Sequence, residues 1–591
     1  MKQFISRRSF MKAAGAATAL TAVSFAAPAA SAEETNCFLG DKSAVTILYT
    51  NDVHTYIDKK SPELTYAAIA ALKKSYEDAG QNVLLVDAGD HIQGTAYGSM
   101  DDGETIIKLM NEAGYDLATP GNHEFDYGMA RAKAVMKEAD FPYISCNWVD
   151  LRTGLKVLPT IKMFTIGGAR IAFVGVTTPE TFTKSTPAYF MNASQTKYIY
   201  DILGGDDGQK LYNAVQKAID KAKFLGATYI IGLGHLGVDP SSSPWTSEEV
   251  IAHTTGFDAF IDGHSHTVME NKQVADASGK AVTLTQTGSY FKNVGKMTIG
   301  ADGAITTELI DTYEGVDAAV AATAAEWISA VDDMLGEEIA VGDSKFYIND
   351  PATGKRRIRS GETNLGDFVA DGIYTYFNEV EQLHCDIAIM NGGGIRSDED
   401  AGYWTFKTCK QVSPFGNVAC LMSVTGKQIQ DALEFAARFA GAEGKENGGF
   451  LQVAGATYEI HTDIPNTVQT DDKNVWIGSA TGTPRVQNVK IYDRANGTYV
   501  PLDENKTYAL AGMNYTLRNL GDGFAMFDGA ELIKDYVSED YLVMSTYAMT
   551  FGGVDAEGLP HLSSANSVLA EYPGYLLDYE NPYGAGRISI L

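Results

Sequence analysis

The chain has 591 residues, a mass of 63.6 kDa and a formal net charge of −29 at pH 7, and it is too long for one ordinary domain of roughly 100–200 residues. With 45% hydrophobic and 20% charged residues, its composition is globular and excludes a disordered or collagen-like protein. The acidic excess argues against a nucleic-acid polymer or an anionic membrane surface as partner, and the five scattered cysteines form neither a disulfide framework nor a zinc ribbon.

The first 32 residues have the features of an export signal. Basic residues, among them Arg7 and Arg8, precede an apolar run at 13–27, and Ala30-Ser31-Ala32 is a small-x-small cleavage pattern. Residues 6–12 resemble a twin-arginine signal, which implies the twin-arginine export machinery as a partner. The apolar run is short for a membrane span, so an uncleaved anchor is the less favoured alternative. We therefore predict an exported protein, periplasmic or extracellular, with no stable membrane span once 1–32 are removed.

Short apolar runs alternate with helical patterns from residue 45 to about residue 305. Buried strands are predicted at 45–49, 83–86, 171–176, 229–233 and 257–261, and helices at 64–76, 104–112 and 210–224. This alternation predicts a layered α/β domain over residues 44–313.

A helix and a second domain follow. Apolar residues recur at helical steps at positions 316, 320, 324, 327, 331 and 334, which predicts one amphipathic helix. We interpret it as an interdomain linker over 314–337. Residues 338–591 are predicted to form a mixed α/β domain, with strands near 386–390, 456–460 and 508–512 and helices near 364–377 and 426–439.

Polar motifs in the first half each follow a predicted strand. They are Asn51-Asp52-Val53-His54, Asp87-Ala88-Gly89-Asp90, Gly121-Asn122-His123-Glu124-Phe125-Asp126, Gly234-His235 and Gly263-His264-Ser265-His266. Because the carboxyl ends of strands in an open α/β sheet face the ligand crevice, these distant loops can share one site. Asp, Asn and His form a nitrogen and oxygen ligand set larger than one tetrahedral ion needs. Two divalent ions sharing a bridging carboxylate would use the whole set, and paired ions suit phosphoryl transfer.

With these motifs the first half resembles the calcineurin-like metallophosphatases, and the mature chain resembles the secreted two-domain 5′-nucleotidases. The resemblance implies two divalent metal ions, of zinc, manganese, cobalt or magnesium. It implies that the first is held by Asp52, His54, Asp90 and His266, and the second by Asp90, Asn122, His235 and His264. It also implies that His123 contacts the phosphate and acts on the leaving oxygen, oriented by Asp126. Several relatives carry an amide at the position of His266, whose imidazole would shift the metal preference toward zinc or manganese.

Glycine-rich and aromatic motifs in the second half suit a nucleotide. Arg396 follows three glycines and can reach a phosphate or ribose oxygen, and Phe415 between Pro414 and Gly416 offers a rigid face for a base. By resemblance, Arg359, Asn391 and Arg396 hold ribose and phosphate. Phe415 and a second aromatic residue sandwich the base, Asn417 and Asp522 bond its edge or the ribose, and Gly448 belongs to the same pocket.

The second aromatic residue is where the resemblance is weakest. Asn514-Tyr515 lies one residue further from Asp522 than the equivalent pair in relatives. Tyr515 is the expected stacking partner, and the alternative is that Tyr515 belongs to the core and that the loop is rearranged.

The remaining histidines and one basic run are predicted to have no role in catalysis or binding. We interpret His91 and the basic run 355–357 as solvated loop residues. His253, His384, His461 and His561 are expected to be surface or packing residues.

We thus predict a metal-dependent phosphoric monoester hydrolase of nucleotide catabolism that cleaves nucleoside 5′-monophosphates, with domain closure over the nucleotide. The alternatives on the same fold are a 2′,3′-cyclic-nucleotide phosphodiesterase with 3′-nucleotidase activity and a UDP-sugar or dinucleotide hydrolase. A more remote alternative is a non-catalytic secreted nucleotide-binding protein, which would be expected to lack metal ligands or His123. The preferred base, the native metal, the oligomeric state and the cysteine pairing are left open.

Overall fold

The computed structural model describes residues 43–192, 197–442, 445–534 and 537–591. The predicted export signal at 1–32 and Cys37 lie outside these ranges. Within them, no helix is both long enough and apolar enough to cross a membrane. Cys146, Cys385 and Cys409 are buried free thiols.

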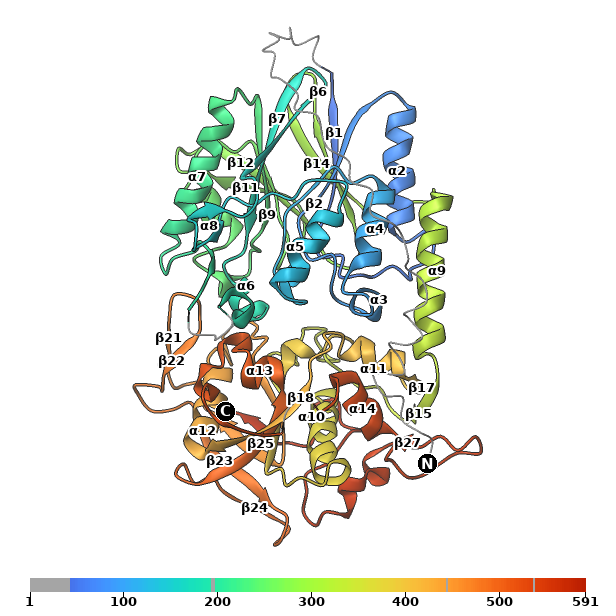
Figure 1. Cartoon of the computed structure of the whole chain (residues 1–591), viewed down its shortest axis with the longest axis vertical. Helices are drawn as coiled ribbons and strands as arrows, with labels where there is room; N and C mark the ends of the chain where they lie inside the picture. The colour runs from blue at the N-terminus through green and yellow to red at the C-terminus, as the bar shows by residue number, and fades with distance from the viewer. Residues whose placement is uncertain (1–42, 193–196, 443–444, 535–536) are drawn as a thin grey trace. The chain divides into compact units, whose positions relative to one another are not determined.

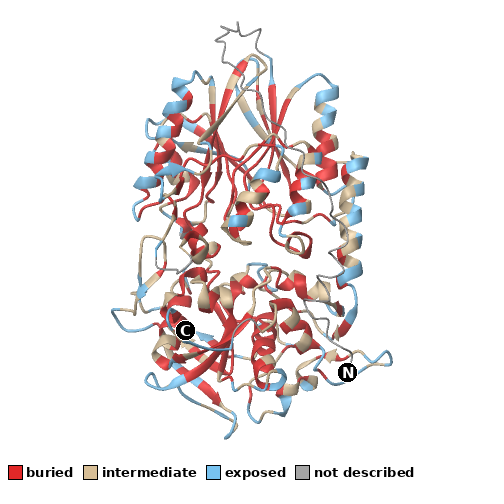
Figure 2. Cartoon of the chain, in the orientation of Figure 1, coloured by how far each residue is buried: buried red, intermediate tan, exposed pale blue. Residues whose placement is uncertain are grey.

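Two β-sheets form the centre of the first half, with strand orders β14-β13-β1-β2-β3 and β11-β12-β10-β9-β7-β6. The first sheet contains β1 (Val45–Thr50), β2 (Asn82–Asp87), β3 (Leu117–Ala118), β13 (Val294–Ile299) and β14 (Ile305–Ile310). The second contains β6 (Ile161–Ile166), β7 (Ala169–Thr177), β9 (Tyr229–His235), β10 (Ala259–Ile261), β11 (Val268–Ala275) and β12 (Ala281–Thr287). Side chains from both sheets pack in one buried cluster, so the sheets face each other (Figure 2).

Helices cover the outer faces of these sheets (Figure 1). On the first sheet lie α2 (Tyr66–Asp78) and α4 (Glu104–Ala113), and on the second lie α7 (Gln209–Phe224) and α8 (Ser247–Ala252). The buried side chains of α7 recur every three or four residues, as an amphipathic helix requires. Smaller elements of this half are α3 (Ala96–Ser99), α5 (Met129–Glu138), α6 (Thr181–Lys184), β4 (Trp148–Asp150), β5 (Leu155–Lys156) and β8 (Tyr200–Ile202). The predicted strands and helices of the layered α/β half are therefore confirmed.

The predicted amphipathic helix after this half is α9 (Ala318–Leu335). Asp317 caps it by accepting hydrogen bonds from the backbone N–H groups of Ala319 and Val320. Its apolar side joins the cluster that includes α2 and α4, and Trp327 donates through Nε1 to the Tyr97 carbonyl at 2.8 Å. The helix is thus packed on the first half and is not a free connection.

The second half is mixed α/β, as predicted, with sheets of order β19-β16-β25-β18-β26, β24-β23-β20-β28 and β17-β15-β27. The strands are β15 (Glu338–Gly342), β16 (Ile387–Asn391), β17 (Gly402–Thr405), β18 (Ala419–Thr425), β19 (Leu451–Ala454), β20 (Ala456–Ile460), β21 (Gln469–Thr470), β22 (Trp476–Gly478), β23 (Val486–Asp493), β24 (Thr498–Pro501), β25 (Thr507–Met513), β26 (Glu531–Lys534), β27 (His561–Leu562) and β28 (Ile588–Ile590). The helices are α10 (Asn364–Thr375), α11 (Phe406–Val412), α12 (Gly426–Ala436), α13 (Asn514–Arg518) and α14 (Asp540–Ala548). The predicted helix at 364–377 continues past Thr375 as a π-helical turn at Tyr376–Val380.

Parallel pairing determines where the polar loops of the first half meet. β1, β2 and β3 run parallel in one sheet, and β7, β9, β10 and β12 run parallel in the other. The carboxyl ends of each set therefore lie at one edge of its sheet, which is the predicted position for a shared site.

Candidate active site

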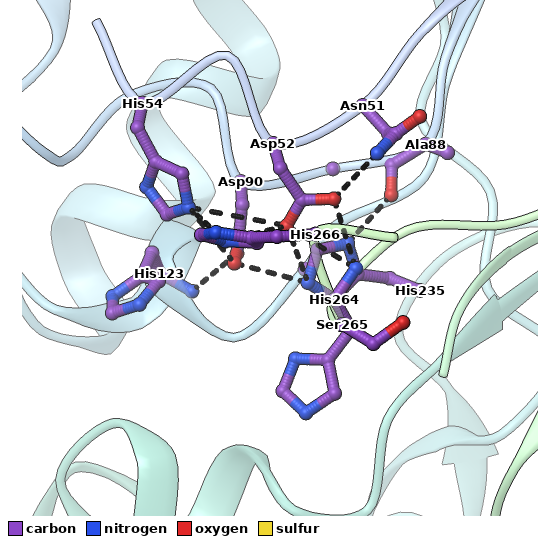
Figure 3. A network of polar contacts seen from close by, with 12 residues as sticks. Asn51, Asp52, His54, Ala88, Asp90, His123, His235, His264, Ser265 and His266 are labelled. Carbon is purple, nitrogen blue, oxygen red and sulfur yellow. Dashed lines mark hydrogen bonds and ion pairs between the residues drawn. The ribbon is translucent and has the colours of Figure 1, made fainter. Parts of the chain in front are cut away.

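The predicted metal ligands come together although they are far apart in sequence (Figure 3). Ligand atoms of Asp52, His54 and His266 lie within 4.8 Å of one another, and so do those of Asp90, His235 and His264. A third group consists of His54, Asp90 and His123, and it shares His54 with the first group and Asp90 with the second. Asp90 thus lies between the two predicted ligand sets, where a bridging carboxylate is needed.

Hydrogen bonds fix which ring nitrogens face this cluster. His54 donates through Nδ1 to the Gln93 carbonyl at 2.9 Å, and His235 donates through Nδ1 to the Ala88 carbonyl at 2.7 Å. Each ring is left with Nε2 as its acceptor nitrogen. Nε2 of His54 lies 3.0 Å from Nε2 of His266, and Nε2 of His235 lies 3.0 Å from Oδ2 of Asp90.

The donor set fits divalent cations. In the described part of the chain, Oδ1 of Asn122 and Nε2 of His235 are buried and take part in no hydrogen bond. Buried polar atoms without a hydrogen-bond partner call for a ligand or a water. Burial lowers the pKa of His235, but the carboxylates of Asp90 and Asp52 outweigh it and raise that pKa to about 10. At this electronegative position a divalent ion can take the place of the imidazole proton, and carboxylates, an amide oxygen and deprotonated imidazole nitrogens are ligands that zinc, manganese or related ions take.

The backbone is strained at the predicted ligands. Asp52, His54, Asp90, His264 and His266 have φ angles between 49° and 78°, in the left-handed region that costs non-glycine residues roughly 1–2 kcal/mol each. Such strain is typical of functional sites. A Cβ atom at Gly121 would lie 2.3 Å from Oδ1 of Asp90, so this close approach requires glycine.

His123 lies beside Asp90 and is paired with Asp126, as the resemblance implies. Its backbone N–H donates to Oδ1 of Asp90 at 2.8 Å, and its Nδ1 donates to Oδ2 of Asp126 at 2.5 Å. Burial lowers the pKa of His123, but the charges of Asp126 and Asp90 outweigh it, and the net shift is upward. This upward shift favours the protonated imidazole, in which Nε2 is the second N–H group.

Glu124 is a structural residue of the site that sequence reasoning left without a role. Its buried carboxylate accepts backbone N–H bonds from Asp90, His91 and Gly121 at 2.8, 2.9 and 2.6 Å. It therefore joins the loop after β2 to the loop after β3.

The interpretation of His91 as a solvated loop residue is wrong. The side chain is fully buried, with Nδ1 2.8 Å from Oδ1 of Asp87 and Nε2 2.7 Å from the Tyr143 hydroxyl. Burial lowers the pKa of His91, but Glu124 and Asp87 outweigh it and raise the pKa to about 9. Asp87 is a local partner, four residues earlier at the end of β2, but Tyr143 comes from a segment 52 positions away, which local sequence does not reveal. His253 and His384 are exposed, and His461 and His561 are half-buried, as expected.

We predict that Glu124→Gln destabilises the protein by roughly 3 kcal/mol, because an amide nitrogen cannot accept the backbone N–H bonds that one carboxylate oxygen accepts. Urea unfolding of the variant measures this change. Glu63→Gln is the control, because the Glu63 side chain is 58% exposed and its loss should change stability by less than about 0.5 kcal/mol. An unchanged unfolding curve for Glu124→Gln would contradict the role of this carboxylate.

A pocket is lined by residues of both halves of the chain. From the first half it contains Asp90, Asn122, His123, Asp126, His264 and His266. All the predicted substrate residues also line it: Arg359, Asn391, Arg396, Phe415, Asn417, Gly448, Tyr515 and Asp522. The two predicted sets of residues thus face one space.

Three arginines give the pocket positive charge despite the acidic chain. Burial, reinforced by the like charges of Arg356 and Arg396, lowers the pKa of Arg359 to about 9. Arg356 lines the pocket and its side chain is only 26% exposed, so the interpretation of this residue as part of a solvated run is wrong. Lys355 is exposed, and Arg357 donates through Nε to the Glu362 carbonyl at 2.7 Å.

The floor of the pocket is built from the glycine-rich loops. Asn391 donates through Nδ2 to Oδ2 of Asp522 at 2.9 Å. A Cβ atom at Gly448 would lie 3.2 Å from Oδ1 of Asp522, so a side chain there would crowd this pair. The Phe415 ring lies 5.9 Å from the His123 ring and 5.6 Å from the Arg396 guanidinium carbon.

Tyr515 lies at the pocket and is only partly buried, which is against the alternative of a core residue. Its ring packs over Gly521, where a Cβ atom would lie 2.5 Å from the ring. Its hydroxyl donates to the Thr183 carbonyl at 2.9 Å and accepts from the Asp522 backbone N–H at 3.1 Å.

Sequence reasoning missed Glu180 and Lys184, which also line the pocket. They follow β7, whose carboxyl end lies beside that of β9. The rule applied to the other strands would have found them, because β7 was predicted as a strand.

Family models match both halves of the chain. Residues 45–268 match the calcineurin-like phosphoesterase model, and residues 340–529 match the model of the 5′-nucleotidase C-terminal domain. Residues 5–24 match the twin-arginine translocation pathway signal sequence. The protein is therefore exported by the twin-arginine route to the periplasm or the extracellular space.

Relatives with 5′-nucleotidase names align along most of the chain. The 5′-nucleotidase of Rattus norvegicus is 27% identical over 90% of this chain and 93% of its own length. The trifunctional nucleotide phosphoesterase of Bacillus subtilis (strain 168) is 28% identical over 86% of this chain, but this chain spans only 34% of that protein. The 5′-nucleotidase precursor of Thermus thermophilus has the same fold, with a TM-score of 0.72 at 24% identity, covering 93% of this chain and 99% of that chain.

The two domain models occur in the order that the sequence predicts, and the donor set of the first half fits metal ions. The chain therefore combines a calcineurin-like phosphoesterase domain with a 5′-nucleotidase C-terminal domain, and it is a metal-dependent phosphoester hydrolase.

Proposed function

We propose that this protein hydrolyses nucleoside 5′-monophosphates to nucleoside and phosphate with two divalent metal ions. The observation that carries the proposal is the pocket that has the donor cluster of the first half and the arginines and Phe415 of the second half in its lining. A phosphate at the donor cluster and a nucleoside against the second half would occupy this space together.

The residues of the first half hold the metal and the leaving group. Asp52, His54, Asp90 and His266 would hold one ion, and Asp90, Asn122, His235 and His264 the other. When bound, the ions supply positive charge for the phosphoryl oxygens and lower the pKa of a water molecule.

His123 donates a proton to the leaving 5′ oxygen. Its contact with Asp90 keeps it beside the metal ligands, and Asp126 holds Nδ1 so that Nε2 carries the transferable proton. The upward shift of the His123 pKa favours the protonated form that supplies this proton.

The residues of the second half select the nucleotide. Arg359 and Arg396 bind phosphate and ribose oxygens, where a guanidinium can form two parallel hydrogen bonds. Asn391 and Asp522 bind the ribose, and Asn417 binds the edge of the base. Phe415 and Tyr515 stack on the base.

A panel of phosphate esters with added manganese, zinc, cobalt or magnesium tests the proposal. We expect AMP or another 5′-monophosphate to be the best substrate. Preference for 2′,3′-cyclic or 3′-nucleotides, or for UDP-sugars or dinucleotides, would overturn the substrate assignment within the same fold. Tight nucleotide binding with no hydrolysis of any ester would overturn the catalytic assignment.

We predict that Phe415→Ala raises KM for AMP about 5- to 150-fold, because stacking a base on an aromatic ring contributes about 1–3 kcal/mol. Hydrolysis of nitrophenyl phosphate, which has no base, should barely change. Phe224→Ala is the control, because Phe224 is 90% exposed on α7. Tyr515→Ala should have the same effect as Phe415→Ala, and the double variant should lose less than the sum. An unchanged KM for AMP in Phe415→Ala would contradict the stacking role.

A further inference from the structure

The turn of chain that follows β7 contacts both parts of the pocket. It consists of Glu180 and the single helical turn α6, and it is closed by backbone hydrogen bonds from Thr183 and Lys184 to the Glu180 carbonyl at 2.9 and 2.8 Å. Its two ends are therefore held in a fixed relation to each other.

The Glu180 side chain contacts a predicted metal ligand. Oε2 of Glu180 lies 2.8 Å from Nε2 of His264, and the same oxygen accepts a hydrogen bond from the Ser242 hydroxyl at 2.6 Å. The Glu180 carboxylate is only 6% exposed, and Ser242 is buried as well. Because Nε2 of His264 is bonded to Glu180, Nδ1 is the ring nitrogen left for an ion beside Asp90 and His235.

A carboxylate in this position does two things to a ligating histidine. It fixes the ring orientation and tautomer, and it makes the other ring nitrogen a stronger donor to the metal. Ser242 limits the movement of the carboxylate itself.

The other end of the turn contacts the nucleoside side of the pocket. The Tyr515 hydroxyl donates to the Thr183 carbonyl at 2.9 Å, and it accepts the backbone N–H of Asp522 at 3.1 Å. A phenylalanine at position 515 could stack on a base but could form neither bond. The hydroxyl group thus connects the loop that carries Asp522 to the turn that carries Glu180.

We propose that Glu180 is a positioning residue for His264 and that the Tyr515 hydroxyl ties the nucleoside-binding loop to the same turn. The identity of the second ligand as a nucleoside rests on the proposed function. Binding of a nucleoside then favours the arrangement in which His264 is aimed at its metal, and the coupling is reciprocal: each ligand strengthens binding of the other by the same factor.

The positioning role of Glu180 is tested by titrating manganese into the metal-free, full mature chain. Calorimetry measures the binding, and no turnover is needed. Glu180→Ala should weaken binding of one ion about 10- to 100-fold and leave the other ion close to its wild-type affinity. Glu180→Gln should recover part of this loss, because its amide oxygen can still accept the His264 N–H. A Glu180→Ala variant that keeps its thermal unfolding temperature and binds both ions with wild-type affinity would overturn the positioning role.

The same titration repeated with saturating adenosine tests the connection that the Tyr515 hydroxyl makes between the nucleoside-binding loop and the turn that carries Glu180. Adenosine should strengthen manganese binding to the wild type about three- to tenfold, the effect of about one hydrogen bond. Tyr515→Phe should lose this enhancement, which is measured as the ratio of its manganese affinities with and without adenosine. Tyr200→Phe is the matched control, since the Tyr200 hydroxyl is bonded to Lys133 and Arg152 away from the pocket residues, and it should keep the enhancement.

An enhancement of full size in Tyr515→Phe, or none in the wild type, would overturn the tie. These outcomes are distinct from a failure of the proposed function. A chain that hydrolyses no 5′-nucleotide but loses one ion in Glu180→Ala would still support the role of Glu180.

Discussion

Asp90→Ala is expected to lose both metal ions and to lower the rate of AMP hydrolysis by more than the roughly 10²–10⁴-fold that an acid–base group contributes. The reason is its position: Asp90 belongs to two of the ligand groups, and its Oδ1 also holds the backbone of His123. Elemental analysis of the purified variant and its rate of phosphate release measure the two losses.

Two comparisons sharpen this prediction. Asp52→Ala should lose one ion and keep the other, because Asp52 belongs to one ligand group only. Asp78→Ala, whose side chain is 67% exposed on α2, should bind both ions and keep its activity. An Asp90→Ala protein that still binds two ions would contradict a bridging role.

His123→Ala is expected to lower kcat for AMP about 10²–10⁴-fold with both ions retained. The loss should be largest for a nucleoside, which is a poor leaving group and needs a proton, and smaller for nitrophenol, which leaves as an anion. Asp126→Asn should give the same pattern with a smaller loss, because it removes the charge that supports the His123 imidazolium.

The ratio of the two losses is the decisive quantity for His123. It is obtained from kcat values of the variant and the wild type on AMP and on nitrophenyl phosphate. Equal losses on both esters would remove His123 from the acid role, and a loss of bound metal would make it a ligand instead.

Much of the first half follows from its sequence, because its signals are local. Apolar runs of strand length, such as the one that becomes β9, are followed directly by glycine and a polar residue such as His235. Parallel pairing brings the ends of these strands to one edge of each sheet. The packing of the two sheets against each other then brings together residues more than 200 positions apart, such as Asp52 and His266.

The residues that sequence reasoning missed depend on tertiary contacts. His91 looks like a loop residue, but the distant Tyr143 and Glu124 close around it together with the local Asp87 at the end of β2. Arg356 lies in a basic run that looks solvated in the sequence, and only the folded structure places it in the pocket lining. Glu180 follows a predicted strand and could have been found as a pocket residue, but its contact with His264, 84 positions away, is a tertiary contact that no spacing rule gives.

The position of Tyr515 illustrates a different limit. Because Tyr515 is shifted by one residue relative to Asp522, its sequence position is compatible with both a core residue and a pocket residue. The glycine at 521 resolves this locally, because the Tyr515 ring lies over it and the loop closes back to Asp522. The hydroxyl contact with Thr183 is a contact between the halves, which no feature of either motif predicts.

The central claim is that this pocket hydrolyses a nucleoside 5′-monophosphate with two metal ions, and one titration tests it most directly. Metal-free mature protein is mixed with AMP and increasing equivalents of manganese, and the initial rate of phosphate release is followed. The account predicts no release without metal and a rate that rises to a plateau at about two equivalents, as a dinuclear site requires. Full activity in the metal-free protein, or no phosphate release from AMP at saturating metal, would contradict it.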